Sequence, residues 1–250
     1  MTAAAATPSS RRVLLTRSEE DCAEWAAELV QRGAEPVSLP CIRCELIATP
    51  ALRAELAAAL PGTDWLVFTS HRGVEAFAAL EPPRSARARV AVVGAATAEA
   101  AHAALGRVDL VGRGGTAAGL AATLLRDGEL AQHPQVLLAV AENAGDVLER
   151  ALRAAGAECT RCNVYRTVAA PPAEPRRPLS GLHVDNVVLA SPSAVTGLVH
   201  QIDLDVPVNV YTIGPSTTAA ARRAGLPVTA EAHEPSLEGI LEAMQWQNRS

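Results

Sequence analysis

The chain has 250 residues, of which 49% are hydrophobic and 3% aromatic, and its 22 Lys and Arg against 27 Asp and Glu give a formal net charge of -5. Nucleic-acid binders usually carry a clustered basic surface, so this balance argues against a nucleic-acid partner. No apolar stretch reaches the roughly 20 residues that a membrane span needs, and we expect no membrane association. The length allows two domains of about 100 to 125 residues each.

The first predicted unit is a strand, a helix and a second strand. Residues 12–16 form a short apolar run, apolar residues then recur at helical spacing as far as Gly33, and residues 36–39 form the next strand. We expect residues 1–11 to be a disordered tail. The apolar run ends too soon for an export signal, which predicts a cytosolic protein.

The remaining elements alternate regularly along the chain. An extra alternating segment at 41–47 is followed by predicted strands at 65–69, 90–93, 108–111, 136–140, 187–190, 208–213 and 228–230, with a second extra segment at 163–168. Helices are predicted between most of these strands, beginning for example near Arg72, Thr97 and Ala117. Strands alternating with helices at this spacing predict parallel sheets that helices cover on both faces.

The second half of the sequence repeats the first. Residues 13–15 and 33–35 match the residues that lie 123 positions later in the chain. Ser70 matches Ser191, which lies 121 positions later, and residues 92–94 match residues 120 positions later. A repeat of this length predicts two similar lobes that face each other across a cleft. Because the two extra segments occupy matching places, we expect them to pair as a connector between the lobes.

Four predicted turns carry small hydroxyl residues, two of them together with glycine, where a strand ends and a helix begins, at residues 69–72, 94–97, 190–194 and 214–218. Ligands of parallel sheets bind beyond the carboxyl ends of the strands. Helix starts there offer main-chain N–H groups to carboxylates or phosphates. Simple N-capping by Ser and Thr is the alternative for any one turn, but four equivalent turns favour an anion site.

Metal and nucleotide sites have less support. The C-x-x-C pairs Cys41/Cys44 and Cys159/Cys162 could suggest zinc, but both lie in or beside strand-like sequence, where positions i and i+3 point to opposite faces. We expect free thiols and no metal. The glycine-rich segment 112–116 matches neither a dinucleotide fingerprint nor a P-loop.

Tyr165, on the second extra segment, is one of only two tyrosines in the chain. A phenol with a reference pKa near 10 stays protonated at neutral pH and can donate a proton to a leaving hydroxyl. Packing within the strand is the alternative interpretation of this residue.

In order, these motifs resemble the uroporphyrinogen-III synthase family. The motifs are Val13-Leu14-Leu15-Thr16-Arg17, Phe68-Thr69-Ser70, Val93-Gly94-x-x-Thr97-Ala98, Val164-Tyr165-x-Thr167, Ser191-Pro192-Ser193-Ala194 and Ile213-Gly214-Pro215-x-Thr217, and the resemblance spans about residues 12–245. It implies a cyclising hydro-lyase of haem biosynthesis that converts the linear tetrapyrrole hydroxymethylbilane into uroporphyrinogen III, with loss of water, inversion of ring D and no cofactor.

The resemblance also implies an architecture. The fold class is α/β, with two similar doubly wound parallel-sheet domains (flavodoxin-like, HemD-like) joined by a two-stranded β connector. Domain 1 would contain residues 12–39 and 173–247, the connector residues 40–50 and 163–172, and domain 2 residues 51–162. A cytoplasmic monomer that receives its substrate from hydroxymethylbilane synthase is the expected form.

By motif match, Tyr165 corresponds to the family tyrosine proposed to assist departure of the hydroxyl. The residues expected to bind substrate carboxylates, partly through main-chain amides, are Arg17, Ser70, Arg72, Thr97, Ser191, Ser193, Gly214, Ser216 and Thr217. Ser18 and Ala95 depart from the family pattern, which leaves individual contacts open. Two alternatives also stay open: a two-lobe protein that binds an anionic small molecule, and a regulator that kept the fold without the activity.

Overall fold

The computed structural model describes residues 12–83, 85, 87–128, 130 and 132–246. The tail expected at residues 1–11, and residue 247 at the expected end of domain 1, lie outside the described residues. Contacts between Cα atoms divide the chain into two compact units, unit 1 (Met1–Cys44 and Val168–Ser250) and unit 2 (Glu45–Thr167). No helix in the described ranges is long and apolar enough to cross a membrane.

Unit 1 is built on a five-stranded parallel sheet in the order β13-β12-β10-β1-β2. The sheet and its helices consist of β1 (Arg12–Leu15), α1 (Glu19–Gln31), β2 (Glu35–Ser38), β10 (Asn186–Leu189), α7 (Pro192–Gln201), β12 (Asn209–Thr212), α8 (Pro215–Arg223), β13 (Val228–Glu231) and α9 (Leu237–Ala243). A small second sheet pairs β9 (Arg177–Pro178) with β11 (Ile202–Asp203), and the short helix η2 (Leu179–Leu182) follows β9.

Alternation along the strands places the core of unit 1 on both faces of its sheet. Val13 and Leu15 pack with residues of α1 and α9, whereas Leu14 between them packs with residues of α7 and α8. Successive side chains of a strand point to opposite faces, so a continuous apolar run is what a strand buried on both faces requires.

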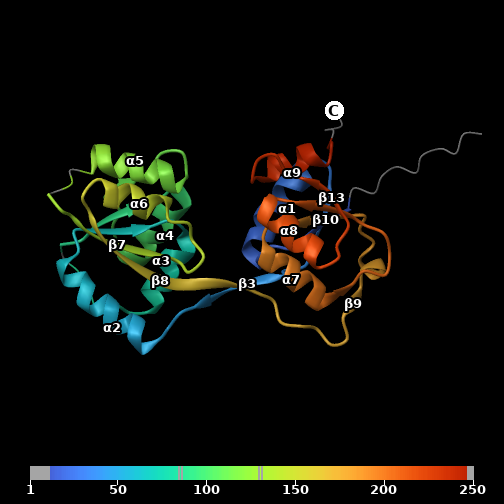
Figure 1. Ribbon diagram of the computed structural model, residues 1–250, viewed down its shortest axis with the longest axis horizontal. Helices are drawn as coiled ribbons and strands as arrows, with labels where there is room; N and C mark the ends of the chain where they lie inside the picture. Colours follow the sequence, from blue (N-terminus) through green and yellow to red (C-terminus); the bar gives the residue numbers. More distant parts are fainter. Residues whose placement is uncertain (1–11, 84, 86, 129, 131, 247–250) are drawn as a thin grey trace, which may run out of the picture. The chain divides into compact units, whose positions relative to one another are not determined.

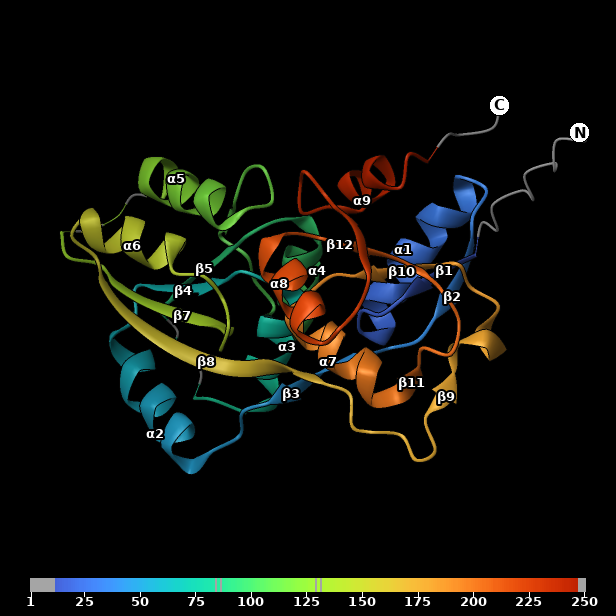
Figure 2. The same cartoon turned by 45° about the vertical axis from the view of Figure 1, so that its right-hand side comes forward.

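Unit 2 contains most of a six-stranded sheet in the order β3-β8-β7-β4-β5-β6. Its elements are β3 (Ile42–Leu46), α2 (Pro50–Ala59), η1 (Leu60–Gly62), β4 (Trp65–Phe68), α3 (His71–Ala79), β5 (Arg89–Val92), α4 (Ala95–Leu105), β6 (Leu110–Val111), α5 (Ala117–Asp127), β7 (Gln135–Ala141), α6 (Val147–Ala154) and β8 (Glu158–Ala169). Helices α5 and α6 cover one face of this sheet and α2, α3 and α4 the other (Figures 1 and 2).

The chain passes between the units inside β3 and inside β8, and these two strands are neighbours in the sheet. The predicted fold class, two doubly wound parallel-sheet domains with a two-stranded connector, is confirmed. The second extra strand is longer than predicted, because β8 runs without a break over its 12 residues.

The two sheets have the same strand order when the repeat is taken into account. From β2, unit 1 reads β2-β1-β10-β12-β13, and from β8, unit 2 reads β8-β7-β4-β5-β6. The sequence repeat equates β1 with β7, β10 with β4, and β12 with β5. In this flavodoxin-like order the direction in which strands are added to the sheet reverses between β1 and β10 in unit 1 and between β7 and β4 in unit 2. Such a reversal is called a switch point, and ligands of these folds bind there, beyond the carboxyl ends of the strands.

Candidate active site

Tyr165 and Ser70 meet at the switch point of unit 2. The phenol oxygen of Tyr165, on β8, lies 3.0 Å from Oγ of Ser70, which directly follows β4 and Thr69. The Tyr165 ring is half-buried against the cluster formed with α2, α3 and α4, and its main-chain oxygen accepts a bond from the Glu142 N–H at 2.8 Å. Tyr165 therefore packs in the strand and also presents a hydroxyl at the edge where ligands bind.

Ser70 is held in place by the start of helix α3. It is the N-cap residue, and its Oγ accepts a hydrogen bond from the Gly73 N–H at 3.0 Å. A Cβ atom at Gly73 would lie 3.0 Å from the Ala139 carbonyl oxygen and 3.3 Å from Ser70 Oγ. The absence of a side chain at Gly73 thus lets the first turn of α3 approach β7 closely, which fixes Ser70 beside Tyr165.

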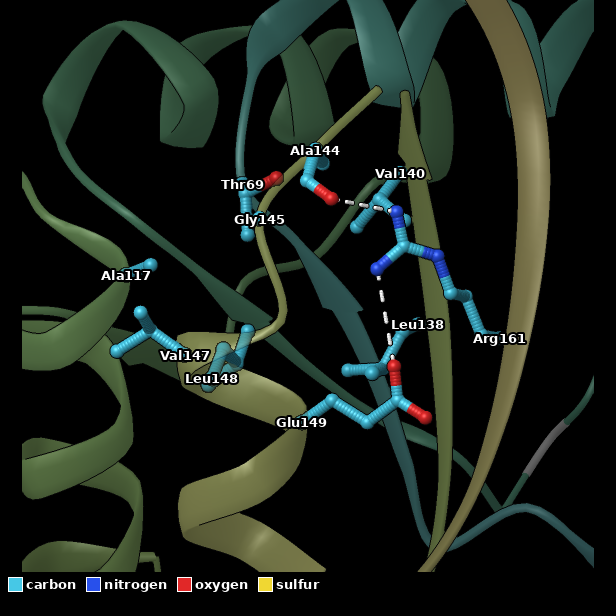
Figure 3. A pocket seen from close by; sticks show the side chains of 10 residues that line it. All are labelled: Thr69, Ala117, Leu138, Val140, Ala144, Gly145, Val147, Leu148, Glu149 and Arg161. Carbon is cyan, nitrogen blue, oxygen red and sulfur yellow. Dashed lines mark hydrogen bonds and ion pairs between the residues drawn. The ribbon is translucent and has the colours of Figure 1, made fainter. Parts of the chain in front are cut away.

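A pocket of about 180 Å³ lies on the α5/α6 face of unit 2, around the loop that follows β7 (Figure 3). Thr69 lines it from the end of β4, and Arg161 from β8. The Arg161 guanidinium donates to the carbonyl oxygens of Ala141 at 3.1 Å and Ala144 at 2.8 Å. Arg161 thereby fixes the loop between β7 and α6.

Arg161 is itself well anchored. Its Nε donates to Oδ1 of Asn163 at 3.0 Å, its Nη1 lies 3.7 Å from Glu149 Oε2, and its side chain is 22% exposed. Sequence reasoning missed this residue. The available signal was an arginine at a partly buried position of the alternating strand β8, where a charge needs partners.

Two helix starts at equivalent places lack a capping side chain. Helices α4 and α8 have Gly94 and Gly214 at the N-cap, and within the described residues no side chain accepts a capping bond from them. Ser216 in the first turn of α8 is exposed, and Gly214 is half-buried. Both starts therefore offer main-chain N–H groups and the positive end of a helix dipole.

Thr97 and Thr217 lie in these first turns but face inward. Their exposed fractions are 4% and 1%. The hydroxyl of either residue would reach a ligand only after a local rearrangement, whereas residues 95–96 and 215–216 of the same turns are exposed. Their expected contact with substrate stays a prediction.

In unit 1, the turn after β10 carries Ser191 and Ser193. Ser191 caps α7 by accepting a bond from the Ala194 N–H at 3.1 Å, and its Oγ lies 3.1 Å from Ser193 Oγ. N-capping, the alternative weighed for the turns, thus occupies the hydroxyls of Ser70 and Ser191. Helices α4 and α8 begin at glycine, which has no side chain to form such a capping bond.

The two candidate arginines occupy different surroundings. Arg17 follows β1, stacks over Trp25 at 4.2 Å from the ring centroid and pairs with Asp21 at 3.3 Å. Its guanidinium is thus held against its own helix α1. Arg72 lies in the first turn of α3 and is half-buried.

The cysteines divide between the faces as alternation predicts. Cys159 packs on the α5/α6 face and Cys162 on the opposite one, while Cys41 is buried and Cys44 exposed. Burial raises the pKa of the Cys41 and Cys162 thiols to about 12. Among the described residues, no group of three or more His, Cys, Asp or Glu is arranged to hold a metal ion.

A family model described as uroporphyrinogen-III synthase HemD matches residues 23–242. A chloroplastic uroporphyrinogen-III synthase from Oryza sativa subsp. japonica is 30% identical over 264 residues, an alignment that covers 99% of this chain and 85% of the rice protein. The chain belongs to the uroporphyrinogen-III synthase family. The predicted family and enzyme class are therefore confirmed, and the chain is a lyase-type cyclase of tetrapyrrole biosynthesis.

Solved structures agree with this assignment at the level of the fold. A uroporphyrinogen-III synthetase from Helicobacter pylori gives a TM-score of 0.55 at 18% identity and covers 94% of this chain and 98% of that one. A mutant uroporphyrinogen III synthase from the extremely thermophilic bacterium Thermus thermophilus gives 0.52 at 21% identity, with 94% and 97% covered. At these identities the likeness concerns the architecture and not the site residues.

Proposed function

We propose that this enzyme closes hydroxymethylbilane to uroporphyrinogen III with Tyr165 as the acid that protonates the departing hydroxyl. The observation that carries the proposal is the Tyr165 phenol, bonded at 3.0 Å to Ser70 at the carboxyl end of β4. A positioned proton donor of this kind contributes about 10²- to 10⁴-fold to a rate.

The chemistry needs little more from acid–base groups. When the hydroxyl leaves as water, the pyrrole nitrogen shares the positive charge that forms on the adjacent carbon. The attacking substituted carbon of ring D carries no hydrogen, so it forms a spiro intermediate whose bond to the original bridge carbon then breaks. The unsubstituted α carbon of ring D bonds to that bridge carbon and loses its proton, which restores the proton given up by Tyr165. The larger task is to fold a flexible polycarboxylate so that the substituted carbon of ring D attacks, which is a matter of positioning and electrostatics.

We assign the binding of substrate carboxylates first to the starts of α4 and α8. Both begin at glycine without a capping side chain in the described part of the chain, and a helix start stabilises a nearby anion by about 0.3–1 kcal/mol at an exposed position. Ser216 is the exposed residue of the α8 turn. Because each contribution is small, several such groups have to act together on one substrate.

The remaining candidates add side-chain contacts. We propose that Arg72, Ser193 and Ser191 bind carboxylates, and that Arg17 does so while it stays paired with Asp21. Thr97 and Thr217 would act through their main chains, since their side chains are buried.

We further propose that the chain acts as a cytoplasmic monomer and takes hydroxymethylbilane directly from the enzyme that makes it. The rice relative is chloroplastic, so fractionation of the host cell is the test of the compartment. Light scattering tests the monomer, and a synthase-coupled assay with a trap for free hydroxymethylbilane tests the handover.

The decisive experiment is incubation of the purified chain with freshly made hydroxymethylbilane, followed by oxidation and isomer analysis. Type III product supports the proposal. The type I isomer alone would point instead to a binding protein or a regulator without activity.

The same assay tests the role of Tyr165. We expect Tyr165→Phe to lower kcat at least about ten-fold, within the range of general-acid effects, with the thermal unfolding midpoint unchanged. Tyr211→Phe is the matched control, because Tyr211 is the only other tyrosine and is buried in unit 1. An unchanged kcat for Tyr165→Phe would remove Tyr165 from the acid role.

A further inference from the structure

The hydroxyl of Ser70 serves two groups at once. Its Oγ accepts the Gly73 N–H of α3 and lies 3.0 Å from the Tyr165 phenol oxygen. A serine hydroxyl has one proton to donate and two lone pairs. With one lone pair engaged by Gly73, the Ser70 proton is available for the phenol oxygen.

The start of helix α3 favours Ser70 as the donor in this pair. The N-terminus of a helix carries a partial positive charge, which draws electron density from the Ser70 oxygen and makes its proton a better donor. A neutral phenol oxygen accepts such a bond weakly. The phenolate that forms when Tyr165 gives up its proton accepts it strongly, since hydrogen bonds to ionised groups are about twice as strong as neutral ones.

The local structure makes this pair rigid. Phe68 and Phe77 pack edge to face at a centroid distance of 5.4 Å, which fixes the end of β4 against α3. Gly73 allows the close approach of α3 to the Ala139 carbonyl. Tyr165 is held by its register opposite Ala141 and by the Glu142 N–H. Neither hydroxyl has to be brought into place during the reaction.

We propose that Ser70 is a positioning residue for Tyr165: it orients the phenol and stabilises the phenolate at the moment the substrate hydroxyl leaves. This inference rests on the proposed acid role of Tyr165, and it replaces the carboxylate contact that the sequence suggested for the Ser70 side chain. The Tyr165 O–H bond breaks and an O–H bond of the departing water forms, while the Ser70 proton stays on Ser70.

The first test compares Ser70→Ala with Thr49→Ala. Thr49 caps α2 by accepting the Leu52 N–H at 3.1 Å, so both variants lose one helix cap, which costs about 1 kcal/mol, but only Ser70 contacts the phenol. We expect Ser70→Ala to lower kcat about ten-fold or more, toward the range seen when one preorganised donor is removed, with KM within about two-fold. Thr49→Ala should keep wild-type kcat.

The pH profile separates the proposed role from a purely structural one. Loss of the Ser70 donor makes the phenol a weaker acid, so the alkaline limb of kcat should move to higher pH in Ser70→Ala and return in Ser70→Thr, which keeps a hydroxyl. A raised KM with unchanged kcat and an unchanged alkaline limb would show that Ser70 binds substrate instead, and would overturn the inference.

Two further variants keep the test decisive. Ser70→Asp retains an excellent helix cap but places a negative charge beside the phenolate, so we expect a lower kcat than for Ser70→Ala in a folded protein; wild-type kcat would overturn the inference. In the Tyr165→Phe background, Ser70→Ala should cause no further loss of kcat. If Tyr165→Phe alone lowers kcat and adding Ser70→Ala lowers it further by the same factor as in the wild type, the inference fails while the acid role of Tyr165 stands.

Discussion

The two units share a scaffold but not its chemistry. Ser70 in unit 2 and Ser191 in unit 1 occupy equivalent places of the repeat, and each caps the helix that follows a buried strand. Ser70 contacts the phenol of Tyr165, whereas Ser191 contacts the hydroxyl of Ser193. At the 123-residue spacing Tyr165 corresponds to Ile42. The repeat therefore contains two sets of similar helix starts, and in unit 2 the capping serine also contacts a tyrosine of β8.

The packing of the equivalent helices α7 and α3 also differs. In unit 1, a Cβ atom at Gly197 of α7 would overlap the main-chain oxygen of Cys41. At the 121-residue spacing of this part of the repeat, unit 2 has Ala76 in α3, which is buried in the core cluster. The same scaffold thus tolerates a methyl group in one unit and excludes it in the other.

The largest expected effect follows from this difference. Alanine is about 1 kcal/mol better than glycine within a helix, but at Gly197 the overlap with the Cys41 main chain should outweigh that gain. We expect Gly197→Ala to lower the free energy of unfolding by about 3 kcal/mol, at the upper end of the usual cost of overpacking. Urea unfolding measures it.

The reciprocal variant Ala76→Gly is the control, with an expected loss of about 1 kcal/mol from helix propensity. Gly197→Ala as stable as the wild type would show that α7 can move away from Cys41, and the contrast between the two helices would disappear.

The second expected effect concerns the loops after the equivalent strands β1 and β7. Arg161 holds the loop after β7, whereas its counterpart at the 123-residue spacing is Ser38 in unit 1. Arg161→Met keeps the aliphatic length but removes the donors to two carbonyl groups. The Ala141 oxygen keeps a bond from the Ala144 N–H at 3.0 Å, so the loss is that of hydrogen bonds from a charged donor, about 1.5–3 kcal/mol. We expect a decrease of roughly 2 kcal/mol in the free energy of unfolding.

The same variant should lower turnover, because the loop that Arg161 fixes begins at Glu142, whose N–H supports the main chain of Tyr165. Arg153→Met is the matched control: Arg153 also pairs with Glu149, at 2.9 Å, and donates to the Cys159 carbonyl oxygen at 2.8 Å, but its side chain is 55% exposed. Exposed pairs contribute about 0–1 kcal/mol, so its stability and turnover should stay near wild type. Equal losses in both variants would show that the ion pair with Glu149, and not the loop, matters.

Local patterns in the sequence predicted the strands of the two large sheets and the opposite faces of the paired cysteines. They also explain why β2 and β3 are separate while β8 is continuous. Pro40 lies between β2 and β3, and proline lacks the N–H that a strand ladder needs; its counterpart in the repeat, in β8, is Asn163. Helix α2 was not predicted, although Thr49 as cap, Pro50 in the first turn and Leu52 and Leu56 at helical spacing supplied the signal.

The contacts of the candidate site could not be read from the sequence in the same way. Ser70 and Tyr165 are 95 positions apart, and no local pattern states which of many hydroxyls meet. The resemblance to the family indicated both residues but assigned Ser70 to the substrate. Arg161 binds main-chain oxygens, which every residue carries, so its partners leave no trace in the sequence.

The smallest expected effect contrasts the amino ends of the two sheets. In unit 2, Asp64 accepts the Gln135 N–H of β7 at 2.9 Å and pairs with Arg87. In unit 1, a neutral pair, Asn186 and Asn209, joins β10 and β12 at 3.3 Å. The Gln135 N–H, and next the Arg87 side chain, lower the pKa of Asp64 below its ordinary value.

A lowered pKa in the folded state means that Asp64 stabilises the protein above the unfolded pKa of about 3.9, and that this contribution is lost as the pH falls below it. We expect Asp64→Asn to cost about 1 kcal/mol at pH 7, the size of one hydrogen bond, and the difference from wild type to shrink as the pH falls below about 4. Asn209→Ala should carry a penalty that does not change with pH. Urea unfolding at a series of pH values compares the two, and a constant Asp64→Asn penalty would mean that geometry, and not charge, holds this end of the unit 2 sheet.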